Sequence, residues 1–391
     1  MKYIKIFENE HDYQTFISTV DYKIPNVSYI LDSKNVKYTP RLAPLPYLTI
    51  EALEDELTTQ LSVSDCEYSL DGKTWIDLPA NTETPKIKTG KKLYFKKILS
   101  NSNSSIGTFT ISKKFKLSGN CNSMIFGDNA KEKLDITGYN NIFSGLFSNC
   151  NSLIEVSSNF LPATTLANSC YSGMFAGCTS LTTAPDLPAI NLSDTCYSGM
   201  FADCTSLTTA PELPATNLSD TCYESMFQNC SALTTAPDLP ATNLTNYCYM
   251  NMFAGCTSLS ISPKTLGENV SNSCCYRMFR DCTSLETAPE LPATTLAESC
   301  YLYMFQNCSA LTTAPELPAT KLVSNCYGYM FINCTNLKYI KALFTTTPSS
   351  SYTGYWVSNV GGNGTFVKNA AATWNVTGNN GVPSGWTVET V

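Results

Sequence analysis

One sequence motif dominates this chain, because it occurs seven times at a fixed interval of 26 residues. Its first copy begins at Cys170 and Tyr171, has a Met-Phe pair next, and reaches a second cysteine at Cys178. A looser copy with the same Phe-x-x-Cys ending precedes it at residues 146–150. A period of roughly 20 to 50 residues is the signature of a solenoid, in which each unit buries its apolar face against its neighbours. The repeat therefore constrains the fold more than any other feature.

The apolar spacing inside one repeat predicts a helix followed by a strand. Cys170, Met174 and Cys178 stand at i, i+4 and i+8, which places them on one side of a short helix. After them Leu-Thr-Thr-Ala is extended and rich in threonine, so residues 181–184 are expected to form a short strand. Two prolines follow and end it, because proline cannot donate to a sheet ladder. Each turn should thus contain a helix, a strand and a proline-rich return.

The amino-acid sequence of the repeat resembles that of a known family. Met-Phe-x-x-Cys-Thr-Ser-Leu-Thr-Thr-Ala-Pro-Glu-Leu-Pro-Ala, as it stands at residues 200–215, is similar to the BspA-like leucine-rich repeats of gut Bacteroidales and their phages. The resemblance covers residues 139–345 and implies an α+β leucine-rich-repeat solenoid of eight turns. One turn departs from the pattern at residues 259–273 but keeps the 26-residue spacing. The fold should therefore continue through this turn, but any surface row of side chains that recurs once per repeat is interrupted there.

The rest of the chain predicts a series of smaller parts around this solenoid. Residues 48–118 alternate apolar and polar side chains around an Asp71-Gly72 hairpin signal, which is typical of a small antiparallel β-sandwich of the Ig-like kind. Trp75 is expected in its core, with stacking on a sugar as the alternative. The full division is a docking segment at 1–40, a linker at 41–47, the β-sandwich at 48–118, an N-terminal cap at 119–145, the solenoid at 146–337 and a C-terminal cap at 338–391.

The first forty residues bury too little apolar surface to be stable alone, so they should dock on a neighbour. Their Lys-Tyr-Ile-Lys-Ile-Phe-Glu opening and Pro-Asn-Val-Ser-Tyr core resemble the leader of structural proteins of Bacteroides (crAss-like) phages. The resemblance implies attachment to other virion proteins. The candidate docking residues are the aromatic ones, namely Tyr3, Phe7, Tyr13, Phe16 and Tyr29.

Composition and cysteine spacing argue against most chemistry in the repeats. The net charge is −7, which disfavours nucleic acid, and the chain has a single histidine, His11, outside the repeats. No Ser-His-Asp or Cys-His site can therefore form there. Two cysteines of one repeat lie eight residues apart, about 12 Å on a helix, which is beyond the reach of a disulfide. The cysteines are predicted to be buried thiols, with a zinc site as the weaker alternative, and we expect no enzyme, cofactor or metal.

Several surface groups remain as candidates for binding. An acidic residue recurs once per turn, at Asp186, Glu212, Asp238, Glu290 and Glu316, and Lys264 interrupts this ladder. We interpret it as a solvated edge; a weak calcium preference and a pair of catalytic carboxylates are alternatives. A group of lysines at residues 86–97 is either a solvated face or a docking surface for an acidic partner. Tyr355 and the C-terminal tryptophans are expected to pack the cap, with sugar stacking as the alternative.

The paired threonines of each turn are the predicted binding face, because a flat row of hydroxyls suits sugars or ordered water. Threonine is also simply a good strand former, so a purely structural role stays open. The candidate residues are Thr182, Thr183, Thr208, Thr209, Thr234, Thr235, Thr312 and Thr313, to which the irregular turn adds Lys264 and Arg277.

These features favour a non-enzymatic phage virion surface protein, in a fibre, tail or head decoration. Its partners would be other virion proteins and a host-surface polysaccharide or protein. The N-terminus has no apolar core typical of a secretory signal, and no stretch approaches the roughly 18 apolar residues of a membrane span. A bacterial cell-surface or secreted BspA-like adhesin is the alternative, and an intracellular scaffold is a third. The ligand and the oligomeric state, for which a trimer is one candidate, stay open.

Overall fold

The computed structural model describes residues 5–7, 29–31, 47–99 and 104–391. The chain divides into two compact units, Met1–Pro46 and Tyr47–Val391. In the first unit, strand β1 (Lys5–Phe7) pairs in parallel with strand β2 (Tyr29–Leu31). Two of the predicted docking residues therefore lie on these strands. The other three, Tyr3, Tyr13 and Phe16, lie outside the described residues.

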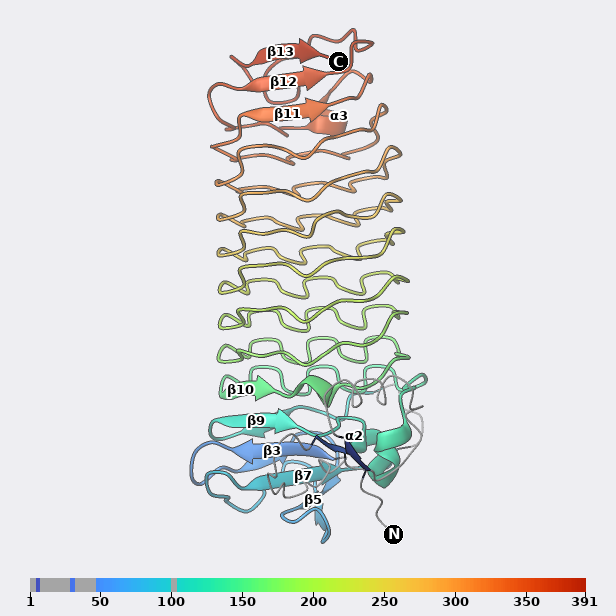
Figure 1. Ribbon diagram of the computed structural model, residues 1–391, viewed down its shortest axis with the longest axis vertical. Helices are drawn as coiled ribbons and strands as arrows, with labels where there is room; N and C mark the ends of the chain where they lie inside the picture. Colours follow the sequence, from blue (N-terminus) through green and yellow to red (C-terminus); the bar gives the residue numbers. More distant parts are fainter. Residues whose placement is uncertain (1–4, 8–28, 32–46, 100–103) are drawn as a thin grey trace. The chain divides into compact units, whose positions relative to one another are not determined.

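The second unit begins with a mixed sheet of six strands in the order β10-β9-β3-β7-β5-β6, and a separate two-stranded sheet pairs β4 with β8 (Figure 1). Most pairs are antiparallel, but β9 and β10 run parallel. Because β10 belongs to the first of the stacked turns, the sheet continues from residues 48–118 into the repeats. The strands are β3 (Leu48–Ala52), β4 (Thr59–Leu61), β5 (Cys66–Ser69), β6 (Ile76–Leu78), β7 (Lys92–Lys96), β8 (Phe109–Ile111), β9 (Phe115–Ser118) and β10 (Leu153–Val156).

The predicted hairpin forms between β5 and β6. Gly72 has φ +71°, which the turn needs, and the Asp71 carboxylate accepts the backbone N–H groups of Lys73 and Thr74, each at 2.8 Å. The prediction for Trp75 is wrong, because its side chain is only partly buried. Its ring packs edge-on against Tyr47, with the centroids 4.7 Å apart, instead of entering the core.

The predicted helix at residues 170–178 does not form. Instead the chain makes successive four-residue turns, in which hydrogen bonds alternate between the same turn and the next repeat. The Met174 N–H donates to the Tyr171 carbonyl (3.2 Å), and the Phe175 N–H donates to the Met200 carbonyl of the next repeat (2.9 Å). Every fourth residue has a positive φ, as at Gly173 (60°). We call residues 169–178 and their equivalents the turn row.

The helix prediction failed because the inward-facing residues of the repeat have a different period from those of an α-helix. Cys170 and Tyr171 point inward, Ser172 and Gly173 lie toward the surface, and the next four residues repeat this order. Two inward residues followed by two outward residues give a pattern that repeats every 4.0 residues. An α-helix repeats every 3.6 residues, so side chains at i and i+4 lie on the same side in both structures. A helix would not place glycine or asparagine at every fourth position, whereas left-handed backbone favours them.

Columns of identical side chains fill the interior of the stacked turns. Phe227 and Phe253 lie parallel with centroids 5.6 Å apart, and Phe253 meets Phe279 at the same 5.6 Å. A tyrosine column runs beside it, with Tyr197 and Tyr223 5.8 Å apart. Methionine, leucine and cysteine form further buried columns. Offset parallel stacking is favourable for aromatic rings, so each repeat stabilises the next through contacts of the same kind.

Elsewhere in each repeat, isolated parallel bridges replace the expected full strands. Residue 235 is paired with 261 and residue 261 with 287, so the bridge recurs every 26 residues. A second series passes through Asn191 and Asn217, which are also joined by a side-chain hydrogen bond of 2.5 Å. Figure 1 shows the resulting turns lying one above another between β10 and β11. We refer to this part of the second unit as the stack.

Both ends of the stack are covered. Before it lie α2 (Ser123–Phe126) and the 3₁₀ helix η1 (Gly127–Glu132), and a second 3₁₀ helix, η2 (Ser158–Phe160), follows β10. After it come helix α3 and a parallel sheet in the order β11-β12-β13. No helix among the described residues is long and apolar enough to cross a membrane. The C-terminal elements are β11 (Tyr339–Ala342), α3 (Ser350–Thr353), β12 (Thr365–Lys368) and β13 (Thr387–Thr390).

Candidate functional site

The cysteines belong to the core, as the sequence predicted. All 18 are free and buried. The second cysteine of each repeat donates its S–H to a phenylalanine carbonyl of the preceding repeat, as Cys204 does to Phe175 at 3.1 Å. Burial raises the pKa of the Cys204 thiol to about 12. A thiol that stays protonated is a poor nucleophile, and these buried, hydrogen-bonded groups fill the core of the stack.

The threonine strip consists of residues 182–183 and their equivalents in each repeat. Its side chains are exposed in the repeats predicted to bind. The hydroxyl of Thr182 already donates to the carbonyl of Ile154, at 3.0 Å, while the backbone of Thr183 pairs in parallel with Glu155. The strip therefore connects successive repeats through its backbone and exposes its side chains.

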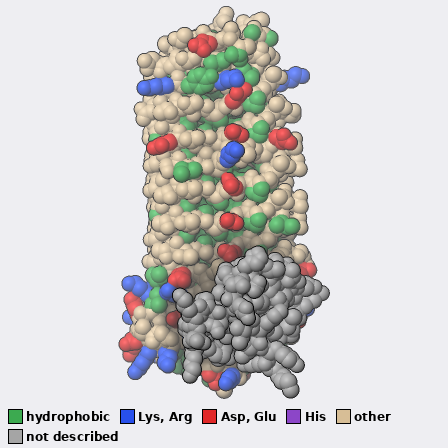
Figure 2. All heavy atoms as spheres, viewed as in Figure 1, with side chains coloured by type: hydrophobic (Ala, Val, Ile, Leu, Met, Phe, Trp, Pro, Cys, Tyr) green, Lys and Arg blue, Asp and Glu red, His purple; other side chains and the backbone are tan. Residues whose placement is uncertain are grey.

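The acidic ladder lies beside the threonine strip, and shallow grooves separate its successive members. One groove of about 440 Å³ is lined by Thr209, Glu212, Thr235 and Asp238 together with alanines, a leucine and prolines. A second, of about 340 Å³, lies between Glu290 and Glu316. Figure 2 shows a row of acidic side chains along the stack with a basic one within it. The grooves repeat with the turns, so this face offers an elongated ligand a series of similar positions.

The irregular turn changes this face, since it has Ser260 and Ile261 where the preceding repeat has two threonines and Lys264 where that repeat has an aspartate. Ile261 takes the place of a threonine and is 56% exposed. Lys264 takes the place of the acidic residue, and its carbonyl accepts the Glu290 N–H at 2.9 Å, which keeps it in the ladder. No ion pair joins its amine to any residue that the structure describes. Arg277, which the sequence analysis grouped with Lys264, is on a different strip, the turn row.

The turn row carries a cluster that the sequence analysis missed, apart from Arg277. The guanidinium of Arg277 lies 4.7 Å from the ring centre of Tyr276 and 5.1 Å from that of Tyr303. Tyr303 stacks on Tyr329 at 4.5 Å, and Tyr329 stacks on Tyr355 at 5.5 Å. We call these five residues the Tyr–Arg patch. The signal that could have found it is a column comparison, because the same position holds Gly, Gly, Ser and Asn in the four preceding repeats.

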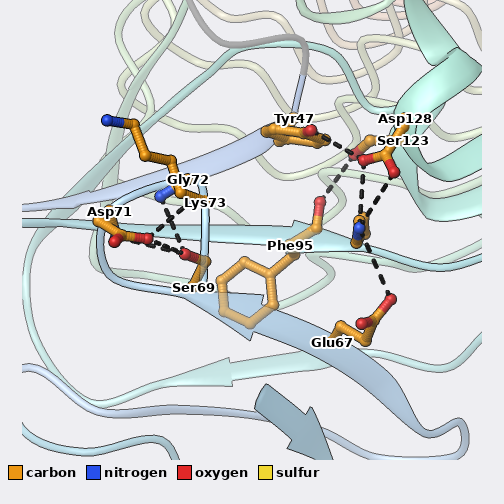
Figure 3. Close-up of polar contacts among 10 residues, drawn as sticks. Tyr47, Glu67, Ser69, Asp71, Gly72, Lys73, Phe95, Ser123 and Asp128 are labelled. Atoms are coloured by element: carbon orange, nitrogen blue, oxygen red, sulfur yellow. Dashed lines mark hydrogen bonds and ion pairs between the residues drawn. The ribbon is translucent and has the colours of Figure 1, made fainter. Parts of the chain in front are cut away.

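A polar cluster at the base of the second unit surrounds Lys96, which is only 9% exposed. Its amine lies 3.1 Å from Asp128 and 4.0 Å from Glu67, and the Tyr47 hydroxyl donates to Asp128 at 2.8 Å (Figure 3). Burial and the hydrogen bond to Asp128 raise the pKa of Tyr47 to about 12. The amine also lies 4.3 Å from the ring centre of Trp75. These five side chains hold one another in place, and the carboxylates neutralise Lys96, so the arrangement is structural.

The lysine group at residues 86–97 is largely paired as well. Lys86 lies 3.3 Å from Glu56, and Lys92 lies 3.3 Å from Glu51. Lys97 donates to the carbonyl of Asp65. An open groove of about 490 Å³ adjoins Lys96 and Lys97, lined by Asp65, Glu67 and Asp77 among others. With three carboxylates along it, this groove has no surplus of positive charge for an acidic partner.

The tryptophans of the C-terminal cap are buried, as the packing interpretation predicted. Trp356 is fully buried, and its indole N–H donates to the Gly381 carbonyl at 3.0 Å. Trp374 donates to the Phe344 carbonyl at 3.1 Å. Neither ring face is available to a sugar. Tyr355 differs, since it is 50% exposed at the end of the tyrosine stack.

Two negative findings complete the description of the candidate sites. Over residues 5–7, 29–31, 47–99 and 104–391, no three His, Cys, Asp or Glu side chains are grouped as a metal site would need. Comparisons with models of protein families and with curated proteins found no match to this chain. The candidate sites therefore rest on the geometry of the exposed strips.

Proposed function

We propose that this chain is a non-enzymatic attachment protein, and that the stack is a BspA-like leucine-rich-repeat solenoid whose outer strips bind a partner. The observation that carries the proposal is the recurrence of exposed groups and grooves along the stack. Thr209, Glu212, Thr235 and Asp238 line one groove, and equivalent prolines and carboxylates line another groove beyond the irregular turn. Continuous faces of this kind are the surfaces through which repeat proteins commonly bind.

The chemistry of these strips suits a polymer of the host surface. Hydroxyls and carboxylates pair readily with the hydroxyls of sugars, and the repeat of the grooves matches a ligand that itself repeats. A catalytic role has less support, because the acidic residues form a uniform series in which no pair differs from its neighbours. The supported function is thus display and binding of a host-surface polysaccharide or protein.

We place the protein on the surface of a phage virion, in a fibre, a tail or a head decoration. This part of the proposal rests on the resemblance of the Lys-Tyr-Ile-Lys-Ile-Phe-Glu opening to phage structural proteins. The first unit would then contact other virion proteins, and the stack would face outward. The resemblance of the repeats to surface adhesins supports an alternative, a bacterial cell-surface or secreted adhesin.

The test is to purify phage particles from a Bacteroides culture that carries the gene. Quantitative mass spectrometry should find the chain in a fixed copy number per particle, and cryo-electron microscopy should show residues 1–46 against another virion protein. Recovery of the chain only in bacterial membrane or medium fractions would reject the virion assignment and favour the adhesin.

A further inference from the structure

Four of the five residues of the Tyr–Arg patch, Arg277 and the tyrosines 303, 329 and 355, occupy one column of the turn row, in which the backbone is left-handed. Gly173 and Gly199 open the column with φ +60° each, and Tyr303 and Tyr329 continue it with φ +59° and +54°. Left-handed backbone is strained for any residue with a Cβ atom and is free of strain for glycine. The large side chains are therefore kept on a backbone that favours glycine, which indicates a use outside the fold.

The patch forms a single stacked ladder. Arg277 covers one face of the Tyr303 ring, and Tyr329 lies parallel to Tyr303 at 14°. Because the faces of the rings are turned toward each other, a ligand meets their edges. Among the described residues, no hydrogen bond engages the hydroxyl of Tyr303, Tyr329 or Tyr355. The edge of the ladder is thus a row of hydroxyls next to a guanidinium.

Arg277 lacks an anionic partner within the described part of the chain. Its Nε atom is buried without an acceptor, and neither a hydrogen bond nor an ion pair satisfies the rest of the guanidinium there. The Nε of the neighbouring Arg280 is also buried without a hydrogen bond, but it lies 3.1 Å from the Asp281 carboxylate, whereas Arg277 has no such carboxylate among the described residues. Arginine has five N–H donors and no acceptor, and it pairs with carboxylates through two parallel hydrogen bonds. A stacked, partly buried arginine without a partner is ready for such a ligand.

We propose that the Tyr–Arg patch binds the carboxylate of an acidic sugar within a polysaccharide, with Arg277 holding the carboxylate and the tyrosine hydroxyls holding the adjoining rings. This inference rests on the proposed binding role and names the ligand class and the site. It does not depend on the particle that carries the chain. The acidic ladder lies on another strip of each repeat, so it does not oppose an anion at this site.

The size of the patch favours a sugar over a protein. Three steps of about 4.8 Å separate Arg277 from Tyr355, so the patch is about 14 Å long. A stable protein interface uses roughly 20 to 30 residues on each side. Toward the N-terminal end, the same row presents Gly173, Gly199, Ala176 and Ala202, which offer no anchoring side chain. A short run of sugar rings fits the length and the row of donors.

The experiment is isothermal titration calorimetry of the full chain with trigalacturonate, its fully methyl-esterified form and neutral maltotriose. Trigalacturonate should bind, and the other two should not. Arg277→Gln should weaken binding at least about tenfold, because it removes charge-assisted hydrogen bonds. Arg277→Lys should weaken it as well, since lysine keeps the charge but loses the planar fork. Tyr329→Phe, which removes one hydroxyl, should cost about threefold.

The matched control is Lys73→Gln, which changes the net charge by the same amount at the exposed β5–β6 hairpin outside the stack and should leave the affinity unchanged. Equal binding of the methyl ester, or equal weakening by Lys73→Gln, overturns the assignment of the carboxylate to Arg277. Binding of hexa-aspartate in place of trigalacturonate overturns the sugar class. Circular dichroism and the melting temperature establish that each variant is folded, and Tyr329→Phe provides a second readout if Arg277→Gln is not. Absence of sugar binding would leave a particle-bound location intact, so the two proposals fail separately.

Discussion

Each four-residue turn of the turn row places two side chains in the core and two on the surface, and these pairs vary differently along the stack. The inward pair is Met-Phe in all seven regular repeats. The outward column changes from Gly173 and Gly199 at one end to Tyr329 and Tyr355 at the other, on the same left-handed backbone. The inner columns are therefore constrained by packing, and the outer column is free to carry binding residues. The four predictions below test this difference.

The largest effect should come from alkaline pH, because the thiols of the inner columns cannot ionise without unfolding. Burial raises the pKa of Cys170, Cys222 and Cys334 to about 12 each, against about 8.5 in an unfolded chain. Their stabilisation is complete below pH 8.5 and is lost as the pH rises toward 12, because the unfolded chain releases protons that the folded chain retains. At pH 9.5 each such thiol costs about 1 kcal/mol.

Several such thiols together exceed the roughly 5 to 15 kcal/mol that stabilises an ordinary domain. We expect the stack to unfold between about pH 9 and 10.5. Circular dichroism during a pH titration, in the presence of a reductant, measures it. An Ellman assay at pH 8 should find no reactive thiol in the native protein and all 18 in guanidinium chloride. Rapid reaction of the native protein would contradict the burial of the columns.

The second prediction compares one inner ring with one outer ring. Phe253 is fully buried between Phe227 and Phe279, so Phe253→Ala should lower the free energy of unfolding by about 3 to 5 kcal/mol. Urea unfolding followed by circular dichroism measures the change. Phe253→Leu is the matched control, since it keeps most of the apolar volume and should cost much less. A small effect of Phe253→Ala would mean that the stacked rings do not hold successive repeats together.

The interior of the repeats was largely predictable from the sequence, and the backbone was not. Cys170, Met174 and Cys178 were expected on one buried side, and they are buried. The helix was wrong because a period of 4.0 and one of 3.6 place the same residues together over two turns. The decisive signal was local: Gly173 and Gly177, four residues apart, mark left-handed positions that a helix cannot contain.

The candidate site was harder to predict for a different reason. Lys264 and Arg277 stand close in the sequence but belong to different strips. The chain runs around one turn of the stack between them, and the sequence alone does not show this path. The stacking of Tyr303 on Tyr329 joins residues 26 apart. Residues one repeat length apart are neighbours in the stack. When the repeats are aligned to each other, such residues fall in the same column, and the contact can be predicted. Trp75 was misplaced because the residue next to a hairpin turn can pack on Tyr47 outside the sheet.

The third prediction uses two glycines of the turn row whose surroundings differ. Gly199 has φ +60° and open space where a Cβ atom would lie, whereas a Cβ on Gly255 (φ +78°) would collide with the side chain of Asn229. Gly199→Ala should cost only the backbone strain, about 1 kcal/mol, and Gly255→Ala should cost about 1 kcal/mol more. Paired urea titrations measure the difference. Equal losses would show that the asparagine side chain moves aside freely.

The smallest expected effect is that of Tyr329→Gly in the outer column. The substitution removes two stacking contacts, at 4.5 and 5.5 Å, each contributing about 0.5 to 1.5 kcal/mol, and releases about 1 to 2 kcal/mol of left-handed backbone strain. These terms oppose each other, so the free energy of unfolding should change by no more than about 1 kcal/mol. Gly173→Tyr, the reverse change in a repeat without neighbouring tyrosines, gains no stack and should destabilise by the strain alone. If Tyr329→Gly lowered the free energy of unfolding by several kcal/mol, the stacked tyrosines would be part of the structural framework. Packing would then constrain this surface column as it constrains the core. A change near zero leaves binding as the reason for a large aromatic side chain on a backbone that glycine fits better.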